Sequence, residues 1–241
     1  MKRTGAQILA RLLQRQGIDT VAGIPGGASL PLYDALRSSD IRHVLARHEQ
    51  GAGFIAQGMA RVTGRAAVCL ATSGPGATNL LTAVADAKAD SVPLVAITGQ
   101  VPTTLLGSDA FQEVDTYGLT LPITKHNFLV RNPAELLDVI PRAFEIAESG
   151  RPGPVVIDLP KDVQTATALF ERWPDPRGRR PPSAFDRTEV ARLAEMIHAA
   201  RRPVLYVGGG VIASGASEQL LALARKNAIP VTCTLTGLGA F

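Results

Sequence analysis

The chain has 241 residues, of which 46% are hydrophobic and 19% charged, so it can bury a substantial core and form one large domain or one and a half. Its formal net charge is only +4, and much of the excess lies in Arg177-Gly178-Arg179-Arg180 without interleaved aromatic residues, so we expect no nucleic-acid partner. No apolar stretch approaches the roughly 20 residues that span a bilayer, and residues 1–5 begin no signal peptide, so we expect a cytoplasmic protein without a membrane partner. Cys69 and Cys233 stand far apart inside apolar runs, which predicts buried, reduced thiols rather than a disulfide or a metal site.

The first predicted elements are a helix, a strand and a second helix. Thr4 is the expected N-cap of a helix whose apolar residues recur at helical spacing, and Gly17 ends it. Residues 18–23 predict a strand and residues 30–37 a helix. The loop between them contains two adjacent glycines, which at the carboxyl end of a strand permit either a sharp turn or the close approach of a ligand. Taken alone, this loop favours the turn.

Residues 47–61 predict a strand end that turns into a tightly packed helix, because a short apolar run is followed by small residues interleaved with larger apolar ones. Glu49 lies at the turn, near the helix N-terminus, where free backbone N–H groups and the macrodipole favour negative charge. Taken alone, Glu49 is explained by this favourable position at the start of a helix and needs no further role. A second unusual loop, residues 72–79, follows one strand later and favours a functional interpretation.

Strands and helices continue to alternate along the chain. Residues 100–121 form an irregular segment, and a loop of this length in a compact domain is usually functional or disordered; its apolar content favours a function. Nearly continuous apolar strands between helices predict an α/β fold with a doubly wound parallel sheet. The elements predicted after residue 61 are strand 66–71, helix 77–89, strand 93–99, strand 127–130, helix 133–148 and strand 154–159.

The chain is predicted to contain two domains. Residues 173–182 are too rich in proline and charge for a core element, so we expect a first domain over residues 1–170, a linker over 171–187 and the beginning of a second, Rossmann-like domain over 188–241. Two strands with their helices are a poor independent core, so we infer an amino-terminal piece of a longer protein. The second domain's predicted elements are helix 188–200, strand 203–207, the triplet Gly208-Gly209-Gly210, helix 217–226 and strand 230–234.

Five short motifs lie in order across the first predicted domain: Pro25-Gly26-Gly27-Ala28, Arg47-His48-Glu49-Gln50-Gly51-Ala52, Thr72-Ser73-Gly74-Pro75-Gly76-Ala77-Thr78-Asn79, Asp109-Ala110-Phe111-Gln112-Glu113, and Gly150-Arg151-Pro152-Gly153-Pro154-Val155 running on to Asp158-Leu159-Pro160-Lys161-Asp162-Val163. Each is weak by itself, but five in register are a strong signal. Together they resemble the pyrimidine-binding domain of thiamine-diphosphate (ThDP) enzymes, most closely the large subunits of the acetohydroxyacid synthase (acetolactate synthase) family.

The resemblance implies an active site built around the ThDP pyrimidine. In this family a glutamate, matched by Glu49, hydrogen-bonds N1′ of the pyrimidine and favours the imino form, whose 4′-nitrogen takes the proton from C2 of the thiazolium. A carboxylate in a poorly solvated pocket can hold and release a proton in this way. Gln112 matches a second catalytic position, where it can hydrogen-bond an oxygen of the substrate or intermediate. For Phe111, ordinary core packing is the alternative. The remaining matches are Ile24, Pro25, Gly26, Thr72, Pro75 and Asn79 toward the cofactor, and Gly27, Ala28, Phe111 and Gln112 toward the substrate.

The family's synthases also bind FAD, which takes no redox part in their reaction. Arg151 and Lys161 match basic positions near that cofactor, and Gly208-Gly209-Gly210 matches a loop over its phosphates. Small residues between a strand and a helix can expose backbone N–H groups to a pyrophosphate. The triplet is not a full G-x-G-x-x-G signature, however, and alone it is more often a tight strand-to-helix turn.

The family's diphosphate-binding half carries a Gly-Asp-Gly motif and an asparagine that hold Mg²⁺, and this chain contains no such motif. The resemblance therefore implies Mg²⁺ with its ligands outside the chain, and no metal ligands within it. It also implies an active site between two subunits, hence a homodimer or homotetramer, and a regulatory small subunit as a further partner. Thr103-Thr104 departs from the basic or bulky residues of many members, so details of the substrate channel do not transfer.

Three functions compete. The first is a ThDP- and FAD-dependent synthase of branched-chain amino acid biosynthesis, a transferase that decarboxylates pyruvate and joins the two-carbon unit to a second 2-oxo acid. The second is another ThDP carboligase or decarboxylase of the same architecture, and the third a non-catalytic nucleotide-binding module. Glu49 argues against the third, since such a module needs no carboxylate at that turn. Phe111-Gln112-Glu113, Arg151 and Lys161 favour the first over the second.

Overall fold

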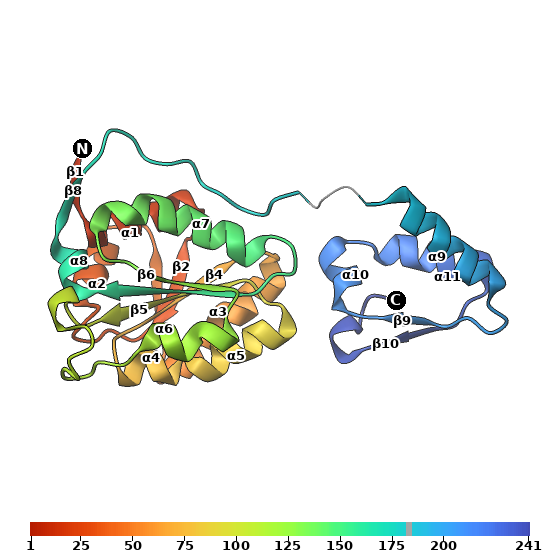
Figure 1. The fold of residues 1–241 in the computed structure, drawn as a ribbon, viewed down its shortest axis with the longest axis horizontal. Helices are drawn as coiled ribbons and strands as arrows, with labels where there is room; N and C mark the ends of the chain where they lie inside the picture. The colour runs from red at the N-terminus through yellow and green to blue at the C-terminus, as the bar shows by residue number, and fades with distance from the viewer. Residues whose placement is uncertain (182–184) are drawn as a thin grey trace. The chain divides into compact units, whose positions relative to one another are not determined.

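The computed structural model describes residues 1–181 and 185–241 (Figure 1). The chain divides into two compact units, Met1–Pro181 and Pro182–Phe241, and each is described by itself. No helix in the described ranges is long and apolar enough to cross a bilayer. The predicted division into residues 1–170, 171–187 and 188–241 stays a prediction.

A six-stranded parallel sheet forms the centre of the first unit, which confirms the predicted doubly wound α/β fold. All residues of its three central strands are buried, because helices cover both faces, and this explains the continuous apolar runs in the sequence. The sheet order is β3-β2-β4-β5-β7-β6. The strands are β2 (Thr20–Gly23), β3 (Arg42–Leu45), β4 (Ala67–Ala71), β5 (Leu94–Gln100), β6 (His126–Leu129) and β7 (Pro154–Pro160).

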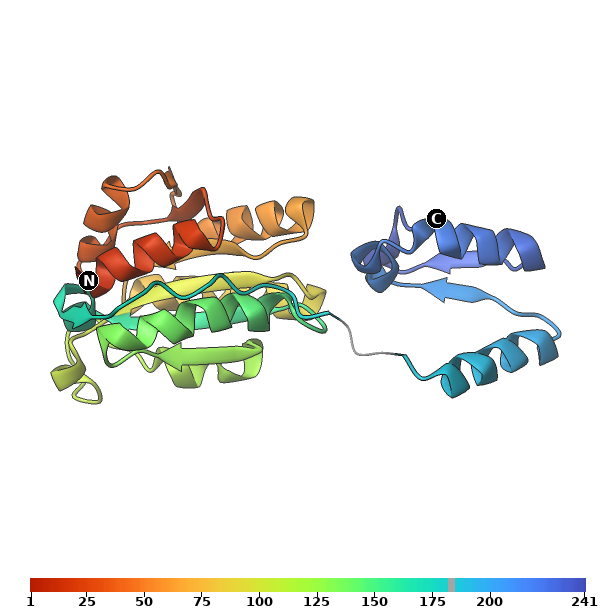
Figure 2. The same cartoon turned by 90° about the horizontal axis from the view of Figure 1, so that it is seen from above.

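Two hydrophobic cores lie on opposite faces of this sheet. One packs α1, α2 and α7 against the strands, and the other packs mostly alanines of α3 and α5. Figures 1 and 2 show α1 and α7 side by side over the same face. The helices are α1 (Gly5–Arg15), α2 (Leu30–Arg37), α3 (Glu49–Thr63), α4 (Pro75–Asn79), α5 (Leu81–Asp90), α6 (Thr116–Thr120), α7 (Leu136–Glu148) and α8 (Lys161–Thr165), with 3₁₀ turns at Thr103–Leu105, Leu121–Ile123 and Pro133–Glu135.

The ends of α1 follow the signals in its sequence. The Thr4 side chain accepts a hydrogen bond from the Gln7 backbone and the Gln7 side chain accepts one from the Thr4 backbone, which is a capping box. Gly17, just past the helix, has a φ of 81°, where glycine is favoured. Helix α1 therefore begins and ends where predicted.

Three features of the first unit differ from the expectations. The predicted helix 77–89 is two helices, α4 and α5, with a break at Leu80. Strand β1 (Lys2–Thr4) pairs antiparallel with β8 (Thr167–Leu169), a long-range pairing that local patterns do not reveal. Within the expected linker, Trp173 packs against the core beside Phe170, with ring centroids 4.7 Å apart.

The second unit contains a two-stranded parallel sheet flanked by helices. Helix α9 buries none of its residues within this unit. Cys233 is half-buried rather than buried as expected, whereas Cys69 is fully buried; both are free thiols. The elements are α9 (Arg187–Ala199), β9 (Leu205–Val207), α10 (Gly209–Ser214), α11 (Ser217–Asn227), β10 (Val231–Cys233) and a 3₁₀ turn at Leu235–Gly237.

Candidate active site

Most predicted site residues of the first unit gather at the carboxyl ends of the central strands, whereas Arg151 precedes β7 and lies at the opposite, amino edge of the sheet. The chain leaves β2 toward β3 on one side of the sheet and leaves β4 toward β5 on the other, so β2 and β4 flank a topological switch point. In open α/β sheets, ligands bind in the crevice outside such a point. The loops that follow these two strands carry the motifs at residues 25–28 and 72–79.

Glu49 is the first residue of α3 and is half-buried. His48 is the N-cap, since its Nδ1 accepts a hydrogen bond from the Gln50 backbone at 3.1 Å. The Asn79 amide donates to Oε2 of Glu49 at 2.9 Å, so the end of α4 meets the start of α3. The carboxylate is thus oriented by one fixed amide donor and by the N-terminus of its own helix.

Thr72 joins the two loops at the switch point. Its hydroxyl accepts a hydrogen bond from the Ala28 backbone at 3.2 Å. A Cβ added to Gly26 would lie 2.5 Å from Cβ of Thr72, and one added to Gly76 would lie 2.7 Å from Cγ2 of Thr72 and 3.3 Å from Oε1 of Glu49. Both loops therefore approach each other only because these positions lack side chains.

The irregular segment 100–121 reaches the same site through Gln112. Gly74 has a φ of 53°, and an added Cβ would lie 2.5 Å from the carbonyl oxygen of Gln112. The segment is locally ordered around Glu113, whose carboxylate accepts hydrogen bonds from the backbones of Gly107 and Ala110. These bonds, first that of Gly107, hold the pKa of Glu113 below its usual range.

Phe111 is 87% exposed, so core packing, the alternative considered for this residue, is wrong within this unit. Gln112, Pro25 and Gly27 are exposed as well, whereas Ile24 and Ala28 are half-buried. Pro75 is the exposed first residue of α4. The substrate-side residues predicted from the sequence therefore lie at the open rim of the site rather than in its floor.

Two residues of this region carry no signal in the sequence motifs. Gln164, on α8, donates to the Ala28 carbonyl at 2.7 Å and holds the first loop. The hydroxyl of Tyr33, on α2, is buried without a hydrogen-bond partner among the described residues. Burial, followed by the nearby Cys69 and Glu49, raises the pKa of Tyr33. Helical spacing shows that Tyr33 faces inward but not that its hydroxyl is near Glu49.

The residues matched to FAD have local contacts. Arg151 donates to Oγ of Ser91 at 2.7 Å and to the Ala89 carbonyl at 3.2 Å, at the carboxyl end of α5. Lys161 is the exposed first residue of α8. In the second unit, Gly208 is the N-cap of α10 and Gly210 is exposed. A Cβ added to Gly209 would lie 2.9 Å from the Thr236 carbonyl oxygen, so the turn itself requires a glycine there.

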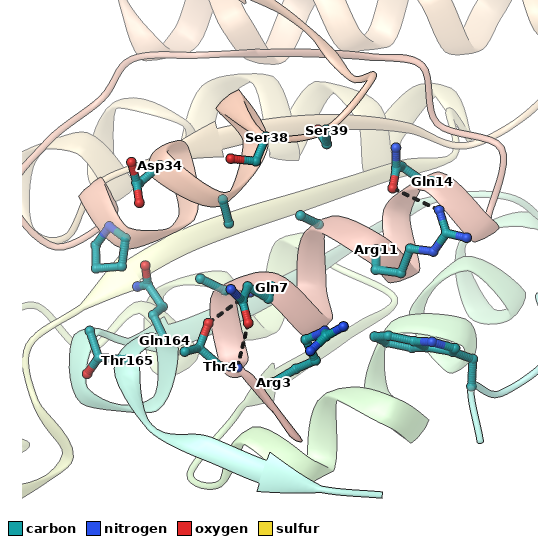
Figure 3. A pocket seen from close by; sticks show the side chains of 15 residues that line it. Arg3, Thr4, Gln7, Arg11, Gln14, Asp34, Ser38, Ser39, Gln164 and Thr165 are labelled. Atoms are coloured by element: carbon teal, nitrogen blue, oxygen red, sulfur yellow. Dashed lines mark hydrogen bonds between the residues drawn. The ribbon is translucent and has the colours of Figure 1, made fainter. Parts of the chain in front are cut away.

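A separate groove of about 740 Å³ lies between α1 and α2 (Figure 3). None of the predicted site residues lines it. Along it, Arg11 donates to Gln14 at 3.2 Å, and Thr4 and Gln7 form the capping box of α1. Over residues 1–181 and 185–241, no group of three or more His, Cys, Asp or Glu residues could hold a metal ion.

Two models of known protein families match the chain. The family model described as "Thiamine pyrophosphate enzyme, N-terminal TPP binding domain" matches residues 3–119, and that described as "Thiamine pyrophosphate enzyme, central domain" matches residues 190–241. The chain belongs to the thiamine pyrophosphate enzymes.

Among its relatives, the acetolactate synthase isozyme 1 large subunit of Escherichia coli (strain K12) is 59% identical over 237 residues, which cover 98% of this chain and 42% of that protein. The acetolactate synthase large subunit of Corynebacterium glutamicum is 55% identical over 244 residues, 100% of this chain and 39% of that protein. The probable acetolactate synthase large subunit of Methanocaldococcus jannaschii is 52% identical over 242 residues, which cover 98% of this chain and 41% of that protein. The chain thus spans between 39% and 42% of the length of these relatives.

Proposed function

We propose that this chain supplies the pyrimidine-binding half of an acetolactate synthase active site, in a protein that decarboxylates pyruvate and transfers the two-carbon unit to a second 2-oxo acid in branched-chain amino acid biosynthesis. The observation that carries the proposal is the Glu49 carboxylate at the switch point, held by the Asn79 amide and flanked by Gly76. The identity to acetolactate synthase large subunits supports this reaction over that of other thiamine enzymes.

The residues fit the pyrimidine of ThDP. An aminopyrimidine is flat and carries ring nitrogens at its edge, so it needs open space beside a carboxylate. Gly26 and Gly76 pack closely against Thr72, which holds both loops beside Glu49, and the neighbouring Pro25, Gly27 and Pro75 are exposed. In the proposed site, Ile24, Pro25 and Pro75 supply apolar contacts to the ring, and Thr72 fixes the two loops.

When bound, ThDP supplies a carbon nucleophile that adds to the 2-oxo acid and stabilises the charge left by loss of CO₂. Glu49 accepts or returns a proton at the edge of the pyrimidine, and Asn79 keeps one carboxylate oxygen turned toward α4 so that the other can face the ring. Gln112 offers an amide to a substrate oxygen at the rim, beside Gly27, Ala28 and Phe111.

The cofactor and partner assignments beyond ThDP rest on the family resemblance. We propose FAD contacts for Arg151, Lys161 and Gly208-Gly209-Gly210, and Mg²⁺ held by ligands outside this chain. Pyruvate is the proposed first substrate. The proposed assembly is a homodimer or homotetramer in the cytoplasm, joined by a regulatory small subunit. An apolar stripe on α3, made of Gly51, Ile55, Gly58 and Val62 and beginning beside Glu49, supports a partner subunit close to the site.

The decisive experiment replaces the carboxylate by an amide. Glu49→Gln in the full-length protein keeps the shape and the Asn79 hydrogen bond but cannot exchange the proton, so turnover of pyruvate should fall about 10²–10⁴-fold while the fold is kept. Glu218→Gln is the matched control, because it makes the same charge change in the first turn of α11. Pyruvate turnover by the Glu49 variant within a few-fold of the control would overturn the proposal.

A further inference from the structure

A buried carboxyl group, Asp158, lies in the middle of the sheet and is 3% exposed. The Thr98 hydroxyl donates to its Oδ1 at 2.7 Å, and Nε2 of Gln100 donates to its Oδ2 at 3.0 Å. Burying a carboxyl is costly unless its oxygens have partners. No role assigned so far to the site uses this group.

Gln100 connects this carboxyl to the segment that carries Gln112. Its Nε2 also donates to the Val114 carbonyl at 2.9 Å, and its Oε1 accepts from the Val101 backbone at 2.8 Å. Gln100 is itself only 2% exposed, so both amide hydrogens and the amide oxygen are used inside the protein. Val114 is two residues from Gln112, whose backbone lies against Gly74.

The rest of the segment is held in a similar way. Near its start, the Asp162 carboxylate accepts from the Thr103 backbone at 3.0 Å and from the Thr103 hydroxyl at 2.5 Å. At its tip, the Glu113 carboxylate accepts hydrogen bonds from the backbones of Gly107 and Ala110. Between tip and sheet, Gln100 is the side chain that joins β5 to Val114. A long exposed loop gains order mainly from such buried anchors, because it has few apolar contacts of its own.

We propose that Gln100 and Asp158 are positioning residues for the reaction: they fix Val114 and thereby hold Gln112 against Gly74 at the rim of the Glu49 site. This inference rests on the proposed function, in which Gln112 contacts the substrate. If the network served only to join β5 and β7, the Thr98 bond to Asp158 would contribute in the same way as the Gln100 bond. The two bonds differ in that Gln100 alone of the pair also binds the segment.

The test compares Gln100→Met with Thr98→Val in the full-length protein. Each removes a buried hydrogen bond to Asp158 with little change in volume, but the methionine also frees the Val114 carbonyl and the Val101 N–H, the two bonds that hold the segment to Gln100. Hydrogen exchange of the Gly107, Ala110 and Glu113 amides should accelerate about tenfold more in Gln100→Met than in Thr98→Val. The methionine variant should also lose more in kcat/KM for pyruvate, because Gln112 is displaced.

A second pair of variants, at Asp158, tests the same network in case Gln100→Met does not fold. Asp158→Asn keeps an oxygen that can accept from Gln100 and should leave exchange of the segment within a few-fold of wild type, whereas Asp158→Leu should accelerate it. Equal acceleration in Gln100→Met and Thr98→Val would overturn the positioning role. The exchange measurement needs no substrate, so it separates this outcome from loss of the proposed function, which Glu49→Gln tests.

Discussion

Gly74 links the two parts of the site at the scale of single residues. It combines a left-handed φ of 53° with a backbone contact to Gln112 that leaves no room for a Cβ. The two constraints are separate, since a side chain at positive φ is strained wherever it occurs, and a clash with backbone cannot be relieved by rotating a side chain.

We therefore expect Gly74→Ala to destabilise the protein by about 2 kcal/mol or more and to raise KM for the 2-oxo acid, because Gln112 must move. Gly64→Ala is the control: Gly64 has a φ of 69°, but an added Cβ would meet nothing within 4 Å. Gly64→Ala should lower the free energy of unfolding by only about 1 kcal/mol, the strain of an alanine at positive φ, and should leave KM unchanged. Denaturant unfolding and pyruvate kinetics distinguish the two. Equal unfolding energies for both variants would show that the contact with Gln112 is not rigid.

The family resemblance assigned Glu49, Thr72 and Asn79 to one site, and these residues do meet at the carboxyl edge of the sheet, where loops after adjacent parallel strands come together. Arg151, assigned with them, lies at the opposite edge. The sequence motifs did not predict the conformation of Gln112, which has a φ of 56°, or the exposure of Phe111. These depend on contacts between segments far apart in the chain. The buried hydroxyl of Tyr33 could not be predicted for the same reason. The assigned roles of these residues remain predictions.

At the scale of elements, the β5–β7 pair contains a group that titrates near neutrality. The pKa of Asp158 is raised to about 7, mainly by burial; the hydrogen bonds from Thr98 and Gln100 lower it, and the negative charge of the exposed Asp115 at the N-cap of α6 raises it. In the unfolded chain this carboxyl has a pKa near 3.8. Between these values the folded protein holds a proton that the unfolded chain releases.

The free energy of unfolding should therefore fall as the pH rises from about 4 to about 7, by at most about 1.4 kcal/mol per pH unit from this group. Asp158→Asn should remove that contribution. The difference between wild type and variant isolates Asp158 from other groups such as His126, whose pKa is lowered by burial. Denaturant unfolding at several pH values provides the measurement. A difference that stays flat, or that increases with pH, contradicts this assignment.

Most regular elements could be predicted from local pattern, since capping residues and buried strands leave clear signals in the chain. The break at Leu80 could not, because apolar and small residues continue through it at helical spacing. Strands β1 and β8 have three residues each and pair across almost the whole first unit, so no local window contains the pairing. Short elements fixed by tertiary contacts are the ones that sequence patterns miss.

At the scale of the whole molecule, the sequence predicted a parallel doubly wound sheet but not its strand order or the contacts of the chain that follows it. Trp173, in the predicted linker, packs on the core, and Arg177 and Arg180 form ion pairs with Glu145 on α7. A proline- and arginine-rich composition indicates an irregular chain, but not the surface along which it runs. The observed unit continues to Pro181.

Helix α3 presents an apolar face that is not covered within the first unit. Gly51, Ile55, Gly58 and Val62 recur at helical spacing; Val62 is 89% exposed and Ile55 37%, and a Cβ added at either glycine would meet nothing within 4 Å. A stripe of small and apolar residues lets another surface approach closely. Because Glu49 begins the same helix, a subunit bound to this stripe would lie near the site.

We therefore expect Val62→Glu to weaken the proposed homodimer at least tenfold, because a charge at a packed interface must be desolvated without a partner. Leu169→Glu is the control, since Leu169 is 78% exposed on β8 and lies outside the stripe. Sedimentation of the full-length proteins over a range of concentrations gives both dissociation constants. Pyruvate turnover by the Val62 variant should fall on dilution and recover at high protein concentration, because the proposed site is complete only in the dimer. A Val62 variant with the dissociation constant of the Leu169 variant would place the subunit contact elsewhere on the molecule.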